Sequence, residues 1–455
     1  MSLKTIFRSV ILFILILPNY LVAQNYADQQ YMLKIDSIFA NIETNDGIVL
    51  NSDGKSLRLQ DGVTEGYVIL KPQYSQSPFN EGLPSWNGTS PDNNSGFKIQ
   101  MRFPYGATWS PWLTVGFWKS NIWSSYGLTS YGGGYVDIDY VKLNSYKNSW
   151  QFKIIMTRTT ADQPSSTIHN LSFFVSDSRT TTSVNITNIV NDNPAEIFIP
   201  TEFICQYDVD PIIGEDICSP TSVSMILKSY SIVVDPYQFA LDTRDPYHNI
   251  FGVWPRVVQN ASEFGLDGAV TRYRTWSEAR EVLANGGRIS MSVGSPLYPN
   301  GHLIMLAGFT TDGRPIVHDP AKSNGYSYIY NKTSISQSWF NKGGISYTFY
   351  PVGSYPTSVE NSLEPLAVDE FTLYQNYPNP FNPGTTISFS LPQVEQVKIS
   401  VYDMLGREVA VLVNDYLESG THTTLFDGKN LSSGVYVYRI ESRSFVKSKQ
   451  MILLK

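Results

Sequence analysis

The sequence predicts three domains in the order all-β, α+β and small all-β. A chain of 455 residues is too long for a single hydrophobic core. Strand-type alternation runs over about residues 45–198 and returns after residue 371, whereas helix-period segments followed by buried strands occupy the region between them. We therefore expect an N-terminal β-sandwich or jelly roll at 24–198, a central α+β domain at 199–353, a polar linker at 354–370 and a small β-sandwich at 371–455.

Residues 1–23 have the features of a secretory signal peptide. Lys4 and Arg8 form a basic start, residues 10–17 are an apolar run, and small residues precede an expected cleavage site before Gln24. This run is too short for a membrane helix, and no later stretch is as long as the roughly 20 apolar residues that such a helix needs. Cleavage changes the formal charge from −7 to −7 − 2 = −9. We expect an exported, mildly acidic mature chain without a transmembrane segment and without a nucleic-acid partner.

The sequence pattern of the N-terminal region predicts a series of β-strands. A short helix is expected within about residues 25–45, and none from there to 198. Inward-facing residues alternate with polar ones in four stretches, which contain Phe97, Ile99, Met101 and Phe103, then Val136, Ile138 and Tyr140, then Trp150, Phe152, Ile154 and Met156, then Leu171, Phe173 and Val175. Six tryptophans lie here, and two interpretations are open: they stack on a glycan partner, or they fill the core and a domain contact.

Cys218 lies at the start of a well-marked helix. Ser219 can cap this helix, and Pro220 suits its first turn. An apolar stripe follows with helical spacing, formed by Val223, Ile226, Leu227 and Tyr230. A helix N-terminus favours negative charge, and a nearby imidazolium can lower a cysteine pKa from about 8.5 to roughly 3–4. Cys218 is therefore a candidate nucleophile.

His302 is the best-placed base for this thiol. It directly precedes the buried apolar run at 303–309, and turn residues at 310–313 lead to a returning strand at 315–320. In such an antiparallel hairpin, His302 and Asp319 lie at the same open end. Alternation places His318 on the opposite face, so His318 is the weaker candidate. Cys218, His302 and Asp319 thus have the types and order of a nucleophile, a general base and a group that orients the base.

Other interpretations of these residues remain open. Cys205 and Cys218 are the only cysteines of an exported chain, so they could form a disulfide. Such a bond would consume the thiol that the helix start and the His302 strand are arranged around. His302, His318 and Asp319 could form a metal site, although the chain has no His-Glu-x-x-His motif and no cysteine cluster. We expect neither a metal nor a cofactor.

The helix start CSPTS at 218–222, the Gly-His pair at 301–302 and the His-Asp-Pro ending at 318–320 resemble the bacteriocin-leader-processing (double-glycine) branch of the papain-like cysteine peptidases. The resemblance covers roughly residues 199–353 and implies a papain-like fold with Cys218 on the helix side of a cleft and His302 on the sheet side. It also implies an oxyanion donor from a glutamine upstream of the cysteine. Gln206 matches that glutamine, with 218 − 206 = 12 residues where the family often shows six. The backbone N–H of Cys218 would be the second donor.

Local signals in the central region agree with an α+β order. A short helix is expected from Pro236, another from Trp254, and a third after the capping box that Thr275 and Glu278 form. Alternating apolar residues at 289–293 then predict the strand that leads to the His302 hairpin.

The C-terminal region carries three motifs at 373–383 (LYQNYPNPFNP), 401–408 (VYDMLGRE) and 434–438 (GVYVY). They resemble the C-terminal sorting domain of type IX secretion. This resemblance implies passage across an outer membrane by the type IX secretion machinery, with the domain removed or used for surface attachment. Alternation at 387–401 predicts a small all-β sandwich.

Two functional hypotheses follow. The first is a secreted or surface-attached cysteine peptidase or amidase, in which Cys218 attacks a peptide, protein or cell-wall peptide. The second is a surface protein that binds glycan or protein through its aromatic sandwich, with an inert papain-like domain. The chain has no membrane helices and no nucleotide-binding loop, so trimming leader peptides inside an export transporter suits it poorly. The chemical state of Cys218 distinguishes the two hypotheses.

Overall fold

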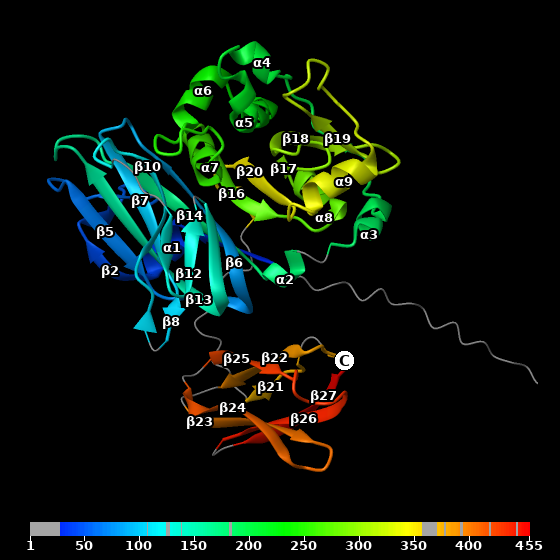
Figure 1. Cartoon of the computed structure of the whole chain (residues 1–455). Coiled ribbons are helices and arrows are strands. Elements are labelled where there is room, and N and C mark those ends of the chain that lie inside the picture. Colours follow the sequence, from blue (N-terminus) through cyan, green and yellow to red (C-terminus); the bar gives the residue numbers. More distant parts are fainter. Residues whose placement is uncertain are drawn as a thin grey trace, which may run out of the picture.

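The computed structural model describes residues 28–106, 108–123, 128–137, 139–181, 184–356, 371–376, 379–391, 395–417, 420–442 and 445–455 (Figure 1). The expected signal peptide and most of the expected linker lie outside these residues.

The N-terminal domain is β-rich, as predicted, and its strands join in one 12-stranded sheet that curls almost into a barrel. The long strand β13 holds this sheet together, since its residues 140–150 pair with β12 and β6 and its residues 151–158 pair with β5 and β7. A separate two-stranded ribbon joins β8 and β9. The strands are β1 (Gln29–Lys34), β2 (Ile42–Asp46), β3 (Ile48–Leu50), β4 (Leu57–Leu59), β5 (Glu65–Leu70), β6 (Gln73–Thr89), β7 (Ser95–Arg102), β8 (Pro104–Tyr105), β9 (Thr108–Trp109), β10 (Leu113–Lys119), β11 (Thr129–Tyr131), β12 (Gly134–Asp137), β13 (Tyr140–Arg158) and β14 (Thr167–Ser176).

Helices in this region differ from the sequence prediction. The expected early helix is only α1 (Ile35–Ala40), because the residues before it form the strand β1. Two short helices that were not predicted, α2 (Ser178–Thr181) and α3 (Ile186–Asn191), follow the last long strand. The side chain of Asn185 caps α3 by accepting the N–H of Asn188. Both helices lie in the stretch that leads from the N-terminal domain to the central domain.

The tryptophans of the N-terminal domain are mostly core residues. Trp86, Trp118 and Trp150 are fully buried. The rings of Trp109 and Trp112 are covered by Arg102, whose guanidinium carbon is 5.3 and 4.4 Å from their centroids. No tryptophan among the residues that the structure describes is a large exposed side chain. The core interpretation therefore accounts for these residues better than a glycan-stacking platform does.

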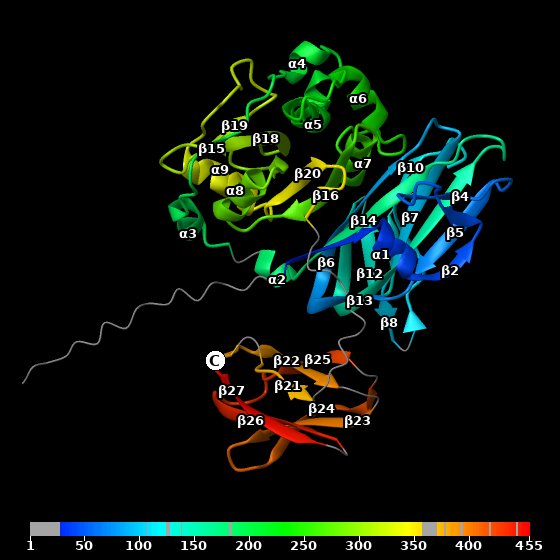
Figure 2. The same ribbon diagram turned by 180° about the vertical axis from the view of Figure 1, so that it is seen from behind.

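The central domain is α+β, and its antiparallel sheet has the order β15-β18-β17-β20-β16 with β19 beside β18. Helices α5, α6 and α7 pack together on this sheet, and α8 and α9 form a second group (Figure 2). The elements are β15 (Ile197–Phe198), α4 (Gln206–Val209), η1 (Gly214–Asp216), α5 (Cys218–Ser229), α6 (Pro236–Thr243), α7 (Trp254–Glu263), β16 (Leu266–Arg272), α8 (Trp276–Ala284), β17 (Arg288–Val293), β18 (His302–Phe309), β19 (Pro315–His318), α9 (Lys332–Phe340) and β20 (Ile345–Pro351).

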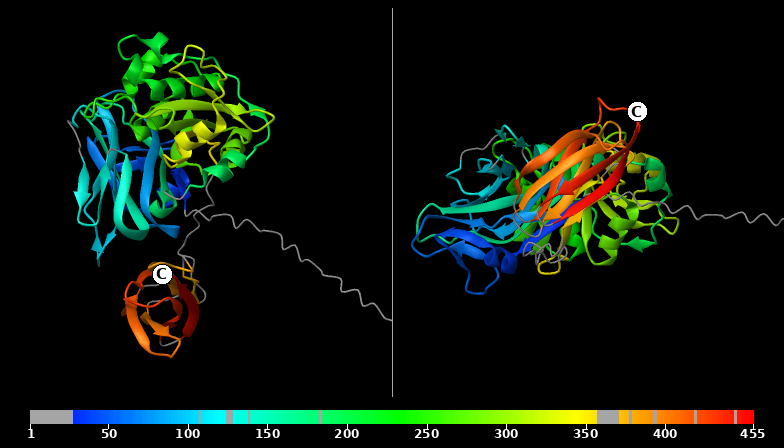
Figure 3. Two further views of the ribbon diagram at one scale, coloured as in Figure 1. Left: turned by 45° about the vertical axis from the view of Figure 1, so that its right-hand side comes forward. Right: turned by 90° about the horizontal axis from the view of Figure 1, so that it is seen from below.

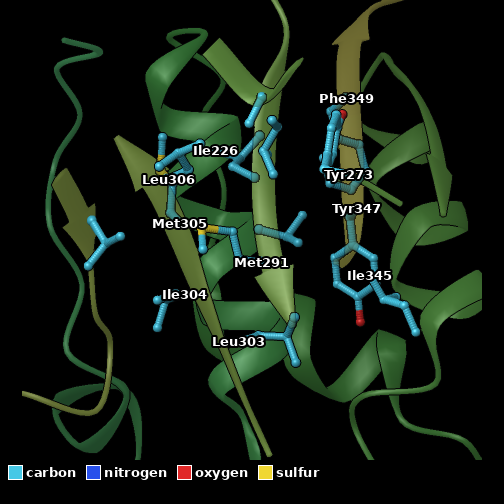
Figure 4. Close-up of a cluster of buried hydrophobic side chains, with 14 of the residues drawn as sticks. Ile226, Tyr273, Met291, Leu303, Ile304, Met305, Leu306, Ile345, Tyr347 and Phe349 are labelled. Carbon is cyan, nitrogen blue, oxygen red and sulfur yellow. The ribbon is translucent and has the colours of Figure 1, made fainter. Parts of the chain in front are cut away.

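Several local predictions for this domain are confirmed. Thr275 accepts the N–H of Glu278 at 3.1 Å at the start of α8, so the capping box forms. Asp235 caps α6, whose first residue is Pro236. The core side chains of β17, β18 and β20 interleave with Ile226 of α5 (Figure 4). This packing fixes the Cys218 helix against the strand that begins at His302.

The first two domains share a polar and apolar interface, and they lie side by side in every view (Figure 3). Glu263 of α7 accepts hydrogen bonds from the indole of Trp118 and the backbone N–H of Ser90, both at 2.8 Å. Gln259 and Ser262 donate to the carbonyl of Gly88. Leu83 and Phe174 of the N-terminal domain also belong to the hydrophobic cluster of the central domain. The two domains therefore pack as one body.

The C-terminal region forms the predicted small all-β domain, with sheets of order β21-β22-β25 and β24-β23-β26-β27 around their own core. Its strands are β21 (Thr372–Leu373), β22 (Gly384–Leu391), β23 (Glu395–Asp403), β24 (Glu408–Leu417), β25 (Gly420–Asp427), β26 (Gly434–Glu441) and β27 (Val446–Leu453). In the part of the chain that the structure covers, no helix has the length and apolarity that a membrane crossing requires.

Candidate active site

Cys218 is the first residue of α5, and Ile217 occupies the N-cap position. The thiol therefore lies where the N–H groups of the first turn have no partner within the helix. The hydroxyl of Ser222 donates to the carbonyl of Leu303 at 2.9 Å, which joins this helix to the strand that begins at His302. The predicted helix and its position beside the His302 strand are confirmed.

The predicted cap at Ser219 is wrong. Its hydroxyl shares a 2.9 Å hydrogen bond with the hydroxyl of Tyr347 on β20, and Ser219 itself lies inside the helix. The sequence pattern suggests a cap because Ser219 directly precedes Pro220. The hydroxyl of Ser219 instead forms a hydrogen bond with Tyr347, which lies far along the chain. Ser219 thus joins the helix to the sheet.

Ser219→Ala should lower the free energy of unfolding by about 1–3 kcal/mol, because it leaves the buried Tyr347 hydroxyl without its partner. The far-ultraviolet circular dichroism should keep its helical signal, since no cap is lost. Chemical denaturation of Ser219→Ala, Tyr347→Phe and the double variant measures the coupling. Strictly additive losses would show that the two hydroxyls do not interact.

His302 and Asp319 meet at the open end of the predicted hairpin. Strands β18 and β19 are antiparallel, with Met305 opposite His318. Nε2 of His302 lies 2.9 Å from Oδ1 of Asp319. The other ring nitrogen of His302, Nδ1, is then left for the hydrogen bond with Cys218. The structure thus brings Cys218, His302 and Asp319 together in one chain of hydrogen bonds.

Asp319 is fully buried, and its carboxylate has four hydrogen-bond partners. Besides the imidazole, the backbone N–H of Ala321 donates to Oδ1 at 3.0 Å, and Tyr298 donates to Oδ2 at 2.6 Å. Tyr330 also donates to Oδ2. A buried carboxylate whose lone pairs are satisfied in this way keeps both its charge and its orientation.

The three groups shift one another's pKa values. Burial raises the pKa of the Cys218 thiol. This effect is outweighed by the hydrogen bond from His302, by the positive charge of the His302 imidazolium and by the N–H groups of Leu303 and Ser219, so the pKa of Cys218 lies below its ordinary value. Burial lowers the pKa of His302, but hydrogen bonds with Asp319 and Cys218 prevail and raise it to about 9. Burial raises the pKa of Asp319, yet the imidazole and the two tyrosines bring it below its ordinary value. These directions favour a thiolate beside an imidazolium.

Gln206 lies close to these residues but makes other contacts. Its backbone N–H donates to the carbonyl of Pro320, and its side-chain Nε2 donates to the carbonyl of Gly214 at 2.6 Å. Gly214 begins the short helix η1 that leads directly to Cys218. The side-chain oxygen of Gln206 is buried and has no partner. Gln206 is therefore anchored between the segment before Cys218 and the residue after Asp319, with the second amide N–H still available.

The alternative interpretations have less support. Cys205 and Cys218 are both free thiols, so no disulfide joins them. His318 is buried on the other face of the hairpin, where its ring stacks on Tyr326 at a centroid distance of 4.7 Å and its Nδ1 accepts the N–H of Ser327. Among the described residues, no group of three or more histidine, cysteine, aspartate or glutamate side chains could hold a metal ion.

Sequence reasoning missed Tyr298, Tyr330 and Lys342. Tyr298 also packs against the imidazole of His302, with ring centroids 4.1 Å apart. The Nζ atom of Lys342 would lie 3.0 Å from a Cβ on Gly301, the residue before His302. All three lie in loops, where no periodic pattern indicates which way a side chain points.

Models of three protein families match separate parts of the chain. Residues 199–347 match the Peptidase_C39-like family, and residues 41–176 match the peptidase C39 N-terminal domain. Residues 375–454 match the secretion system C-terminal sorting domain. The two resemblances found in the sequence are thereby confirmed, and the N-terminal domain gains a relation to the same peptidase group that the sequence did not suggest.

The whole chain has only weak similarity to known proteins. No curated protein matches the chain. Solved structures that resemble it include PorZ of Porphyromonas gingivalis (16% identity, TM-score 0.15, covering 36% of this chain and 25% of PorZ) and dimeric latent PorU of the same organism (10%, 0.17, 94% and 34%). A Paenibacillus xanthan lyase is a third (8%, 0.18, 94% and 26%). The chain spans about a third or less of each of these proteins.

Proposed function

We propose that this chain, which carries a peptidase C39-like domain between a C39 N-terminal domain and a type IX sorting domain, is a secreted cysteine peptidase. In this proposal its catalytic residues are Cys218, His302 and Asp319. The observation that carries the proposal is the hydrogen-bonded chain from Cys218 through His302 to Asp319. The substrate class is a peptide, protein or cell-wall peptide. An N-terminal signal peptide followed by type IX secretion would deliver the enzyme to the outer-membrane surface or the medium.

In the proposed reaction, Sγ of Cys218 attacks the carbonyl carbon of the scissile bond. The C–N bond breaks as the His302 imidazolium gives its proton to the leaving nitrogen, and the acyl group remains as a thioester on Cys218. His302, now neutral, takes a proton from water while the oxygen of that water attacks the thioester. The C–S bond breaks, the acid leaves, and the thiolate and imidazolium are restored. Asp319 orients the imidazole and stabilises its positive charge.

In this proposal, two N–H groups support the oxyanion. The backbone N–H of Cys218 belongs to the first turn of α5 and has no partner within the helix. The second amide N–H of Gln206 is the other donor, provided that the carbonyl of Gly214 keeps holding the first. Removing one donor of an oxyanion hole lowers kcat by about 10²–10³.

Thiol labelling of the mature protein without reductant tests the proposal. Iodoacetamide should alkylate Cys218 rapidly at about pH 6, because the lowered pKa of Cys218 keeps the thiolate at a pH where an ordinary cysteine, with a pKa of about 8.5, is protonated. His302→Ala should slow this labelling strongly. Peptide mass mapping identifies the labelled residue, and an unfolded cysteine peptide serves as the reference thiol. Labelling of Cys218 no faster than that reference would contradict the proposal.

The hydrolysis rate should have a bell-shaped pH profile. It rises as pH passes upward through the lowered pKa of Cys218, because the thiolate forms. It falls as pH passes about 9, because His302 then loses the proton that the leaving group needs. Steady-state kinetics on a peptide substrate measures both limbs. A descending limb near pH 6.5, the ordinary pKa of histidine, would show that Asp319 and Cys218 do not raise the pKa of His302.

A further inference from the structure

Two cavities lie beside the candidate active site and share Asn341 and Lys342 as a common wall. The first, of about 370 Å³, is bordered by Gly301, the residue before His302. The second, of about 330 Å³, is bordered by Trp254 and Arg272 of the central domain and by two residues of the N-terminal domain. Asn341 and Lys342 therefore separate two cavities that lie along the loops next to the catalytic candidates.

Lys342, which borders both cavities, lies close enough to Cys218 for their charges to interact. A Cβ on Gly252, two residues before Trp254, would lie 3.6 Å from the Cβ of Ser219, the neighbour of Cys218. The first cavity lies on the His302 side, where Lys342 approaches Gly301. An extended peptide that occupied both cavities would pass Asn341 and Lys342, which border both.

The N-terminal domain forms a fixed wall of the second cavity. Tyr140 and Lys142, at the start of β13, line it. The hydroxyl of Tyr140 contacts Arg272 and Glu81, and the carboxylate of Asp139 accepts the backbone N–H of Trp254 at 3.0 Å. The wall is therefore hydrogen-bonded to the central domain at the cavity itself, in addition to the interface along α7.

The charged side chains that border the two cavities are all cationic, in a chain whose formal net charge is −7. The side chain of Arg272 is only 2% exposed, and Glu81, 3.4 Å away, balances its charge. Lys142 is exposed, with Nζ 5.0 Å from the centroid of the Tyr140 ring. No ion pair joins Lys142 or Lys342 to a carboxylate within the residues that the structure describes. Burial raises the pKa of Asp139 to about 7, so its carboxylate offsets these lysines only in part at neutral pH.

We propose that the N-terminal domain completes the substrate cleft, and that Lys142 and Lys342 bind a carboxylate of the peptide substrate close to the bond that Cys218 cleaves. This inference rests on the proposed function and adds a substrate class to it. The carboxylate belongs either to an aspartate or glutamate side chain or to the free C-terminus of the peptide, because both present the same group to a lysine.

Cleavage of a peptide library of known sequences by the full mature chain, with product identification by mass spectrometry, tests this subsite. Aspartate and glutamate should be enriched at one fixed position beside the cleaved bond. Cleavage at a fixed distance from the C-terminus that C-terminal amidation abolishes would instead identify the terminal carboxylate, and either result supports the subsite. For a matched glutamate and glutamine peptide pair, Lys142→Glu should lower the preference in kcat/KM for the glutamate peptide about tenfold or more.

The matched control is Lys55→Glu, which reverses the charge of another exposed lysine of the N-terminal domain outside both cavities and should keep the wild-type preference. Library cleavage without an acidic preference, unchanged in Lys142→Glu, would overturn the subsite and leave the peptidase intact.

If the library is not cleaved, the subsite is tested by the ratio of the rates at which iodoacetate and iodoacetamide alkylate Cys218. This ratio should fall in Lys142→Glu and in Lys342→Met, and an unchanged ratio would overturn the subsite. Failure of both reagents to alkylate Cys218 would instead overturn the proposed function.

Discussion

Cys218→Ala should abolish peptide hydrolysis, with kcat/KM lower by a factor on the order of 10⁵ or more, because the reaction has no other nucleophile at this position. The effect is this large because the thiolate, the imidazolium and the carboxylate act as one unit. Adding His302→Ala to Cys218→Ala should therefore lower kcat/KM little further. Progress curves with high enzyme concentration measure the residual rate.

Cys205→Ala is the matched control, since Cys205 is the only other cysteine and is a buried free thiol. It should retain wild-type hydrolysis and wild-type labelling of Cys218. Equal loss of activity in both variants, with folding intact by circular dichroism, would count against Cys218 as the nucleophile and would favour a joint role of the two thiols.

Asp319→Ala should lower kcat/KM by about 10²–10⁴ and the free energy of unfolding by about 3–5 kcal/mol. The variant removes the partner of Nε2 of His302 and leaves the hydroxyls of Tyr298 and Tyr330 without their acceptor. The hydrogen bond with Asp319 raises the pKa of His302, so its loss should also move the descending limb of the pH profile from about 9 to lower pH. Steady-state kinetics across pH give kcat/KM and the position of the descending limb, and chemical denaturation gives the free energy of unfolding.

Asp319→Asn and Asp312→Asn make the experiment specific. Asp319→Asn keeps an acceptor for Nε2 of His302 but removes the negative charge, so it should shift the descending limb with a smaller loss of stability than Asp319→Ala. Asp312 lies in the exposed turn of the same hairpin, where Arg314 contacts it, and Asp312→Asn should leave the profile unchanged. A wild-type pH profile in both Asp319 variants would remove Asp319 from the proposed mechanism.

The parts of the site that sequence reasoning predicted are those that local rules determine. A buried run, a turn and a returning strand determine the register of a hairpin, so the meeting of His302 and Asp319 followed from their spacing. The helix-start signals after Cys218 likewise predicted its position at the N-terminus of α5. The hydroxyl of Ser219 was assigned wrongly, because its partner Tyr347 lies 128 residues away and no local pattern connects them.

The rest of the site depends on contacts between distant loops. Tyr298 and Tyr330 reach Asp319 from two separate loops, and neither carries a motif. The interleaved strand order of the N-terminal sheet, in which β13 pairs with β5, β6, β7 and β12, also could not be obtained from alternation, which identifies strands but not their neighbours. Tyr140 and Lys142 border the second cavity only because of that order.

The shared hydrophobic cluster of the first two domains has a practical consequence for anyone who shortens this chain. A fragment of residues 199–347 would keep every candidate catalytic group, yet it would lose Leu83 and Phe174 from its core and Trp118, Ser90 and Gly88 from the outer face of α7. The buried carboxylate of Glu263 and the amide of Gln259 would then face solvent beside newly bared apolar surface. Such a fragment should be recovered as aggregate, and the smallest soluble unit should begin before β1 and end after β20.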